Sequence, residues 1–102
     1  MQLSSYQQAV LRGSLLKGEE NEFVVSTLGL AGESGEVADL VKKSFHPGGE
    51  QNVTRLVEEL GDVLWYLTHL AGLLGYTVEE LASINYNKLS ERYPTNYPQV
   101  FE

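Results

Sequence analysis

The sequence predicts an all-α protein in which four helices form a bundle. Apolar residues recur at helical spacing in every long segment, and no segment shows the alternation of a strand. Only three of the 102 residues are prolines, so the segments between the breaks run without interruption. The length suits a single domain covering residues 1–102. A domain of this size hides only about two-thirds of the surface of its unfolded chain, so we expect oligomerisation to complete the bundle.

Turn residues and helix caps indicate where the helices begin and end. Asn21 can cap the second helix, and residues 46–49 (HPGG) form the clearest break in the chain. Gly18 ends the first helix, and Thr77 with Glu80 fits a capping box before the fourth. The expected helices cover about residues 5–16, 22–45, 53–74 and 78–92.

Three glycines interrupt the expected second helix at three-residue spacing: Gly29, Gly32 and Gly35. Each costs about 1 kcal/mol relative to alanine inside a helix. One interpretation makes residues 29–35 a loop that divides the helix in two. We favour a continuous helix, because small residues along one edge let another backbone or a ligand approach closely.

Composition excludes several classes of protein. Acidic residues number 14 against 7 basic ones, a net charge of -7, which argues against a nucleic-acid partner because phosphate backbones are held by clustered Lys and Arg. Cysteine is absent, which excludes disulfides, thiolate metal sites and Cys nucleophiles. No phosphate-binding loop of the GxxxxGK[ST] type is present. Without a basic, apolar leader or a run of about 18 apolar residues, we expect a cytoplasmic protein that does not enter a membrane.

Two pairs of carboxylates stand three residues apart, Glu33 with Glu36 and Glu59 with Asp62. This spacing places each pair on one face of its helix, with Cβ atoms about 5–6 Å apart. Both pairs interrupt apolar stretches, where charges are costly unless they are paired or bind metal. One such pair is usually a solvated helix face, but two pairs on adjacent antiparallel helices would concentrate four carboxylates.

The ligand type favours some metals over others. Carboxylate oxygens suit Mg²⁺, with Mn²⁺ as a possible substitute, rather than zinc. Di-iron helical bundles use Glu-x-x-His on two helices. Here Glu36 and Asp62 occupy the positions where histidine would stand, which disfavours iron.

Three segments resemble a known family. Residues 29–39 read GLAGESGEVAD, residues 58–66 read EELGDVLWY, and residues 85–94 read NYNKLSERYP. In this order they resemble the MazG-like all-α NTP pyrophosphohydrolases over about residues 22–94. The resemblance implies hydrolysis of an NTP or dNTP to the monophosphate and pyrophosphate, in nucleotide-pool sanitation or control. It also implies a homodimer or homotetramer, and Mg²⁺ bound by Glu33, Glu36, Glu59 and Asp62.

The catalytic base is expected among the carboxylates of the second helix. A glutamate that is not fully engaged by metal could take the proton of the attacking water. Glu36 is the first candidate for this role and Glu33 the second.

Four further residues are candidates for binding the substrate. Asn85 and Lys88 share a helix face in the third segment and would contact phosphate or the metal shell. Lys43 lies two turns beyond Glu36 and could reach a phosphate, or it could be a solvated lysine at the helix end. Tyr66 could line the nucleotide pocket or belong to the core. Trp65, in contrast, is expected in packing or at an interface.

Two alternatives remain open from the sequence. One is hydrolysis of phosphoribosyl-ATP within the same superfamily. The other is a non-catalytic helical oligomerisation or regulatory module whose acidic patch binds a basic partner. The sequence does not select the base or the sugar of the substrate, because a few side chains in the pocket decide such specificity.

Overall fold

The computed structural model describes residues 1–18 and 20–99, and within them it contains four α-helices and no strand. This confirms the all-α prediction. The helices are α1 (Leu3–Gly13), α2 (Glu22–Ser44), α3 (Val53–Leu73) and α4 (Val78–Arg92). None of the helices in this described part of the chain is both long and apolar enough to cross a membrane.

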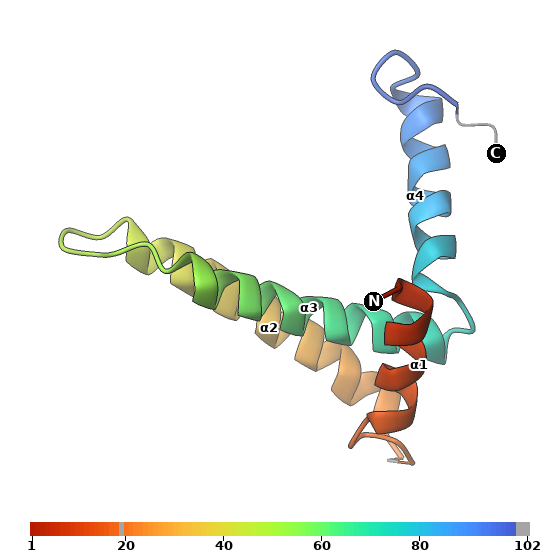
Figure 1. The fold of residues 1–102 in the computed structure, drawn as a ribbon, viewed down its shortest axis with the longest axis horizontal. Helices are drawn as coiled ribbons and strands as arrows, with labels where there is room; N and C mark the ends of the chain where they lie inside the picture. Colours follow the sequence, from red (N-terminus) through yellow and green to blue (C-terminus); the bar gives the residue numbers. More distant parts are fainter. Residues whose placement is uncertain (19, 100–102) are drawn as a thin grey trace.

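Helices α2 and α3 form a long antiparallel hairpin, which is the main packing unit of the chain (Figure 1). Helix α1 lies across the end of α3 remote from the hairpin loop. Helix α4 contacts α1 and α3 but makes no contact with α2, and it points away from the hairpin. The radius of gyration is 16.6 Å, whereas a compact domain of this length has about 13 Å. The four helices therefore do not close around one core within a single chain.

The open arrangement leaves much apolar surface uncovered. Only two apolar residues are buried among the described residues, Val10 and Ala71. Large apolar side chains on each of the three longer helices are more than half exposed, among them Leu28 on α2, Val57 on α3 and Ile84 on α4. A single copy of the chain therefore hides little of the apolar area that stabilises folded proteins.

Helix α1 begins about two residues and ends about three residues earlier than expected. It ends at Gly13, and the buried Ser14 follows with an extended backbone. The hydroxyl of Ser14 accepts a hydrogen bond from the backbone N–H of Leu16 at 3.1 Å. Serine side chains offer backbone groups such alternatives to a helix. Gly18, expected as the helix end, instead adopts a positive φ of 85° in the turn that follows.

The caps of the other helices agree better with the sequence. The capping box before α4 is confirmed, because Thr77 Oγ1 accepts from the Glu80 N–H at 3.1 Å and Glu80 Oε1 accepts from the Thr77 N–H at 3.0 Å. Asn52 caps α3 by accepting from the N–H of Arg55 at 3.0 Å. Asn21 precedes α2 as expected, but its side chain makes no capping hydrogen bond.

Helix α2 is continuous through its three glycines, as the sequence analysis favours. At Gly29 the reason is visible, because a Cβ there would overlap the ring of Tyr66 on α3. The group that closely approaches α2 at Gly29 is therefore the Tyr66 side chain, whereas the sequence analysis expected a backbone or a ligand. At Gly32 and Gly35 a Cβ would meet no atom within 4 Å, so packing within the chain does not require glycine there.

The buried side chain of Gln7 joins three helices. Its Nε2 donates to the carbonyl oxygens of Tyr76 (2.9 Å) and Thr68 (3.3 Å), and its Oε1 accepts from the N–H of Val78 (3.2 Å). The Val78 N–H is one of the helix-start donors that no helical carbonyl can satisfy. Gln7 thereby fixes the start of α4 to α1 and α3.

We expect Gln7→Leu to lower the free energy of unfolding by about 2–3 kcal/mol, because it leaves buried backbone groups without partners. Gln8→Leu, on the exposed side of the same helix, is the matched control and should change stability by less than about 0.5 kcal/mol. Urea unfolding of both variants measures the difference. Equal stability of the two would contradict this role.

Candidate functional site

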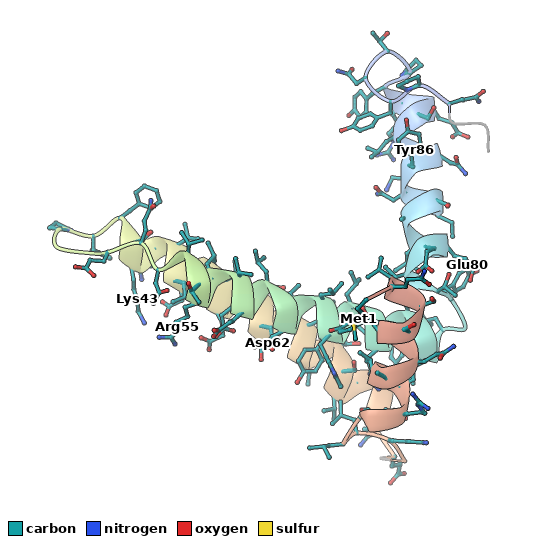
Figure 2. The ribbon with its side chains drawn as sticks, viewed as in Figure 1. Met1, Lys43, Arg55, Asp62, Glu80 and Tyr86 are labelled. Atoms are coloured by element: carbon teal, nitrogen blue, oxygen red, sulfur yellow. The ribbon has the colours of Figure 1, made fainter. Side chains whose placement is uncertain are left out.

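Three of the four predicted metal ligands lie together. Glu33 of α2 and Glu59 and Asp62 of α3 each offer a carboxylate oxygen, and these oxygens lie within 4.8 Å of one another. Glu33 and Glu59 are half-buried, and Asp62 is exposed. The three-residue spacing puts Glu59 and Asp62 on one face of α3, and antiparallel pairing brings Glu33 to that face. Figure 2 shows Asp62 between the hairpin loop and the crossing of α1.

The electrostatics of this carboxylate cluster favour a cation. Partial burial raises the pKa of Glu33, and so do its hydrogen bond with Glu59 and the negative charges of Asp62, Glu59 and Glu36. These effects all disfavour the ionised form of Glu33 when no cation is present. A hard divalent cation takes oxygen ligands of this kind and would relieve the repulsion. The residues present therefore fit the expected metal.

The fourth predicted ligand, Glu36, stands apart from the cluster. It is exposed, one turn further along α2, and its carboxylate is not among the oxygens that lie within 4.8 Å of one another. Its charge nevertheless contributes to the raised pKa of Glu33, so it lies within electrostatic reach. The structure thus offers a cluster of three carboxylates with a further, uncommitted carboxylate beside it.

A cleft of about 530 Å³ opens beside the cluster. This volume falls in the range of small-molecule sites, about 300–1,000 Å³. Its walls combine the carboxylates with aromatic and aliphatic side chains of α3 and of the turn after α1. It is lined by Gly13, Leu15, Leu16, Glu33, Asp62, Trp65 and Tyr66.

Of the four predicted substrate-binding residues, only Tyr66 lines this cleft. Lys43 lies nearer the hairpin loop (Figure 2) and lines a separate pocket of about 220 Å³ there. Its Nζ forms an ion pair with Asp39 at 2.7 Å, which lowers the pKa of that carboxyl. Asn85 and Lys88 are exposed on α4, which does not contact α2. The described chain does not bring these three residues to the carboxylate cluster.

The structure also adds residues that the sequence did not indicate. Tyr6 of α1 has a raised pKa, caused by burial and by the negative charge of Asp62, so its hydroxyl lies near the cluster. Leu15 and Leu16 line the cleft, as does Trp65, which was expected in packing or at an interface. Tyr6, Leu15 and Leu16 reach the site because α1 crosses the end of α3. No local sequence pattern predicts where these two helices cross.

Comparison with known proteins identifies the family. The model of the MazG nucleotide pyrophosphohydrolase domain matches residues 22–97, which include α2, α3, α4 and the carboxylate cluster. The chain therefore belongs to the MazG nucleotide pyrophosphohydrolase domain family. Helix α1, which contributes to the cleft, lies outside the matched range.

The chain is also similar to the Gene 37 protein of Mycobacterium phage L5. The two are 40% identical over 70 residues, which make up 65% of this chain and 61% of the phage protein. The match thus spans less than two-thirds of the length of that relative. No solved structure matches the chain.

The raised pKa of Glu33 predicts how the metal-free protein responds to pH. Glu33 binds its proton more tightly in the folded chain, so stability should rise as the pH falls from neutral through the raised pKa towards the ordinary value of 4.5. Glu33→Gln should therefore be more stable than the unmutated protein near neutral pH, and the difference should shrink towards pH 4.5.

Thermal melting in the presence of a chelator measures this effect. Glu91→Gln, which removes an exposed carboxylate from α4, is the matched control for net charge and should show a smaller gain. A Glu33→Gln protein that is no more stable than Glu91→Gln at neutral pH would contradict the repulsion described for the cluster.

Proposed function

We propose that this chain is a divalent-metal-dependent pyrophosphohydrolase that converts an NTP or dNTP to the nucleoside monophosphate and pyrophosphate. The observation that carries the proposal is the carboxylate cluster of Glu33, Glu59 and Asp62 beside a cleft of ligand size. Membership of the MazG family supports the choice of reaction. We further propose that residues 1–102 act as one domain, in nucleotide-pool sanitation or control in the cytoplasm, with no nucleic-acid partner.

The metal in this proposal is Mg²⁺, with Mn²⁺ as a substitute. Glu33, Glu59 and Asp62 would hold it, and Glu36, which lies within electrostatic reach of Glu33, would be the fourth ligand. When bound, such an ion neutralises charge on phosphate oxygens and lowers the pKa of a bound water.

The chain's own residues would position the substrate and take up a proton. Glu36 is exposed and uncommitted, so its carboxylate is free to accept the proton of the attacking water. Glu33 is the second candidate, because it lines the cleft in which the substrate would lie. Tyr66 lines the cleft and would contact the nucleotide. Lys43 would reach a phosphate only by leaving Asp39.

Asn85 and Lys88 could serve as phosphate contacts only through another copy of the chain. Helix α4 does not reach α2 of its own chain, so in a homodimer or homotetramer a neighbour's α4 would supply these two residues. An apolar groove of about 290 Å³ between the end of α3 and α4 supports such an assembly, because a single copy leaves it uncovered. Its side chains include Leu67, Leu70, Leu74, Leu81 and Ile84.

A panel of ribo- and deoxyribonucleoside triphosphates, incubated with Mg²⁺ and separated by chromatography, tests the reaction. We expect monophosphate and pyrophosphate as products. Asp62→Asn and Glu36→Gln should lower kcat/KM by about 100-fold or more, because Asp62 would hold the metal and Glu36 would accept a proton in the transition state. Glu91→Gln should retain activity. Diphosphate and orthophosphate as products would assign the protein to another class.

Light scattering tests the assembly. We expect at least a dimer of the 11.3 kDa chain at micromolar concentration, because the exposed apolar groove needs a cover. Ile84→Lys, which places a charge in the groove, should shift the protein towards the monomer. A monomeric unmutated protein would rule out a neighbour's α4 as the source of the phosphate contacts.

A further inference from the structure

The single tryptophan of the chain stands in the wall of the cleft. Trp65 lies one turn beyond Asp62 on α3 and lines the cleft together with Asp62 and Glu33. It is half-buried. Its position allows its ring to meet a molecule whose phosphates lie at the carboxylate cluster.

Neighbouring rings hold Trp65 on two sides. The ring of His69, one turn further along α3, is stacked on it with centroids 5.1 Å apart and planes 11° apart. The ring of Tyr66 meets it edge-on, with centroids 5.0 Å apart and planes 77° apart. Within residues 1–18 and 20–99, no second ring is stacked on Trp65.

Part of the Trp65 side chain is open to the cleft, because Trp65 is half-buried and is among the residues that line it. The cleft volume of about 530 Å³ leaves room for a planar group beside the ring.

His69 is itself fixed by a buried network. Its side chain is fully buried, and both ring nitrogens have partners on α2, with Nε2 3.1 Å from Glu22 Oε1 and Nδ1 2.8 Å from Ser26 Oγ. The Glu22 carboxylate can only accept, so Nε2 donates to it, and in the tautomer with its proton on Nε2 the Nδ1 atom accepts from the Ser26 hydroxyl. The ring cannot rotate without breaking both bonds.

The same three residue types form the triads of hydrolases. Here the side chain of Ser26 is fully buried, so no substrate can reach its hydroxyl. The hydrogen bonds with Glu22 and Ser26 therefore serve to hold His69 in position. They tie the first turns of α2 to His69, and through His69 to the plane of Trp65.

We propose that Trp65 is the platform on which the planar base of the nucleotide stacks, and that His69, held by Ser26 and Glu22, is a positioning residue that fixes this platform. The inference rests on the proposed function and names the part of the substrate that this wall of the cleft recognises. Stacking on an aromatic ring accepts every base. It would thus distinguish nucleotides from inorganic polyphosphates without choosing among the bases.

Fluorescence tests the platform without requiring hydrolysis, because all tryptophan emission comes from Trp65. Deoxynucleoside monophosphates, added with Mg²⁺, should quench the emission in a saturable way, whereas inorganic tripolyphosphate should not. Absence of quenching by all four monophosphates, or equal quenching by tripolyphosphate, would overturn the proposal. The quenching test does not depend on hydrolysis. If the monophosphates quench the emission but no triphosphate is hydrolysed, the platform is supported and the proposed function is wrong.

Kinetics with the best triphosphate test the recognition step. Trp65→Leu should raise KM by about tenfold or more and leave kcat within about twofold, because stacking stabilises bound substrate and transition state alike. Trp65→Phe keeps a ring and should recover most of the affinity. An unchanged KM in Trp65→Leu, or a Phe variant as weak as the Leu variant, would contradict the platform.

The positioning role has its own matched pair of variants. Ser26→Ala removes the hydroxyl that fixes His69, and should raise KM about threefold with little change in kcat and should alter the Trp65 emission. Thr68→Val is the control, because Thr68 is equally buried next to His69 but its hydroxyl has no partner. It should leave KM and emission unchanged. If Ser26→Ala changes them no more than Thr68→Val, His69 does not position Trp65.

Discussion

The antiparallel pairing of α2 with α3 is the constraint on which the site depends. Each helix carries carboxylates on one face, but a cluster arises only because the hairpin sets those faces opposite each other. The ring of Tyr66 packs where Gly29 has no side chain, which fixes the distance and register of the two helices beside the cluster. Glycine is unfavourable inside a helix, but at position 29 it permits the packing contact with Tyr66. This contact holds the carboxylates of the two helices close together.

The remaining helices shape the surroundings of that cluster. Helix α1 brings Tyr6 near Asp62 and carries Leu15 and Leu16 to the cleft. Gln7 holds the start of α4, so that α4 extends away from the hairpin with its apolar side open. The chain therefore has a cluster of mutually repelling carboxylates on the α2–α3 hairpin, and an uncovered apolar groove between the end of α3 and α4. A cation would relieve the repulsion within the carboxylate cluster, and another copy of the chain would cover the apolar groove.

Sequence patterns predicted what depends on local periodicity, namely four helices, the capping box at Thr77, and the shared helix face of Glu59 and Asp62. They placed the end of α1 too late, because the turn is set by the hydroxyl of the buried Ser14. Neither the roles of Gln7 and Trp65 nor the separation of Lys88 from the cluster could be predicted. These depend on how distant helices cross, and a period of 3.6 residues carries no information about crossings.

Direct measurement of metal binding tests the central claim, that facing carboxylates of α2 and α3 hold a divalent cation. Mn²⁺ binding can be followed by electron paramagnetic resonance for the unmutated protein, Asp62→Asn and Glu91→Gln. Changes to residues that merely orient metal ligands alter affinity by about 10–100-fold, so loss of a ligand should weaken binding at least as much. We predict saturable binding by the unmutated protein and Glu91→Gln, and binding at least about tenfold weaker by Asp62→Asn. Equal affinity in all three proteins would contradict the account.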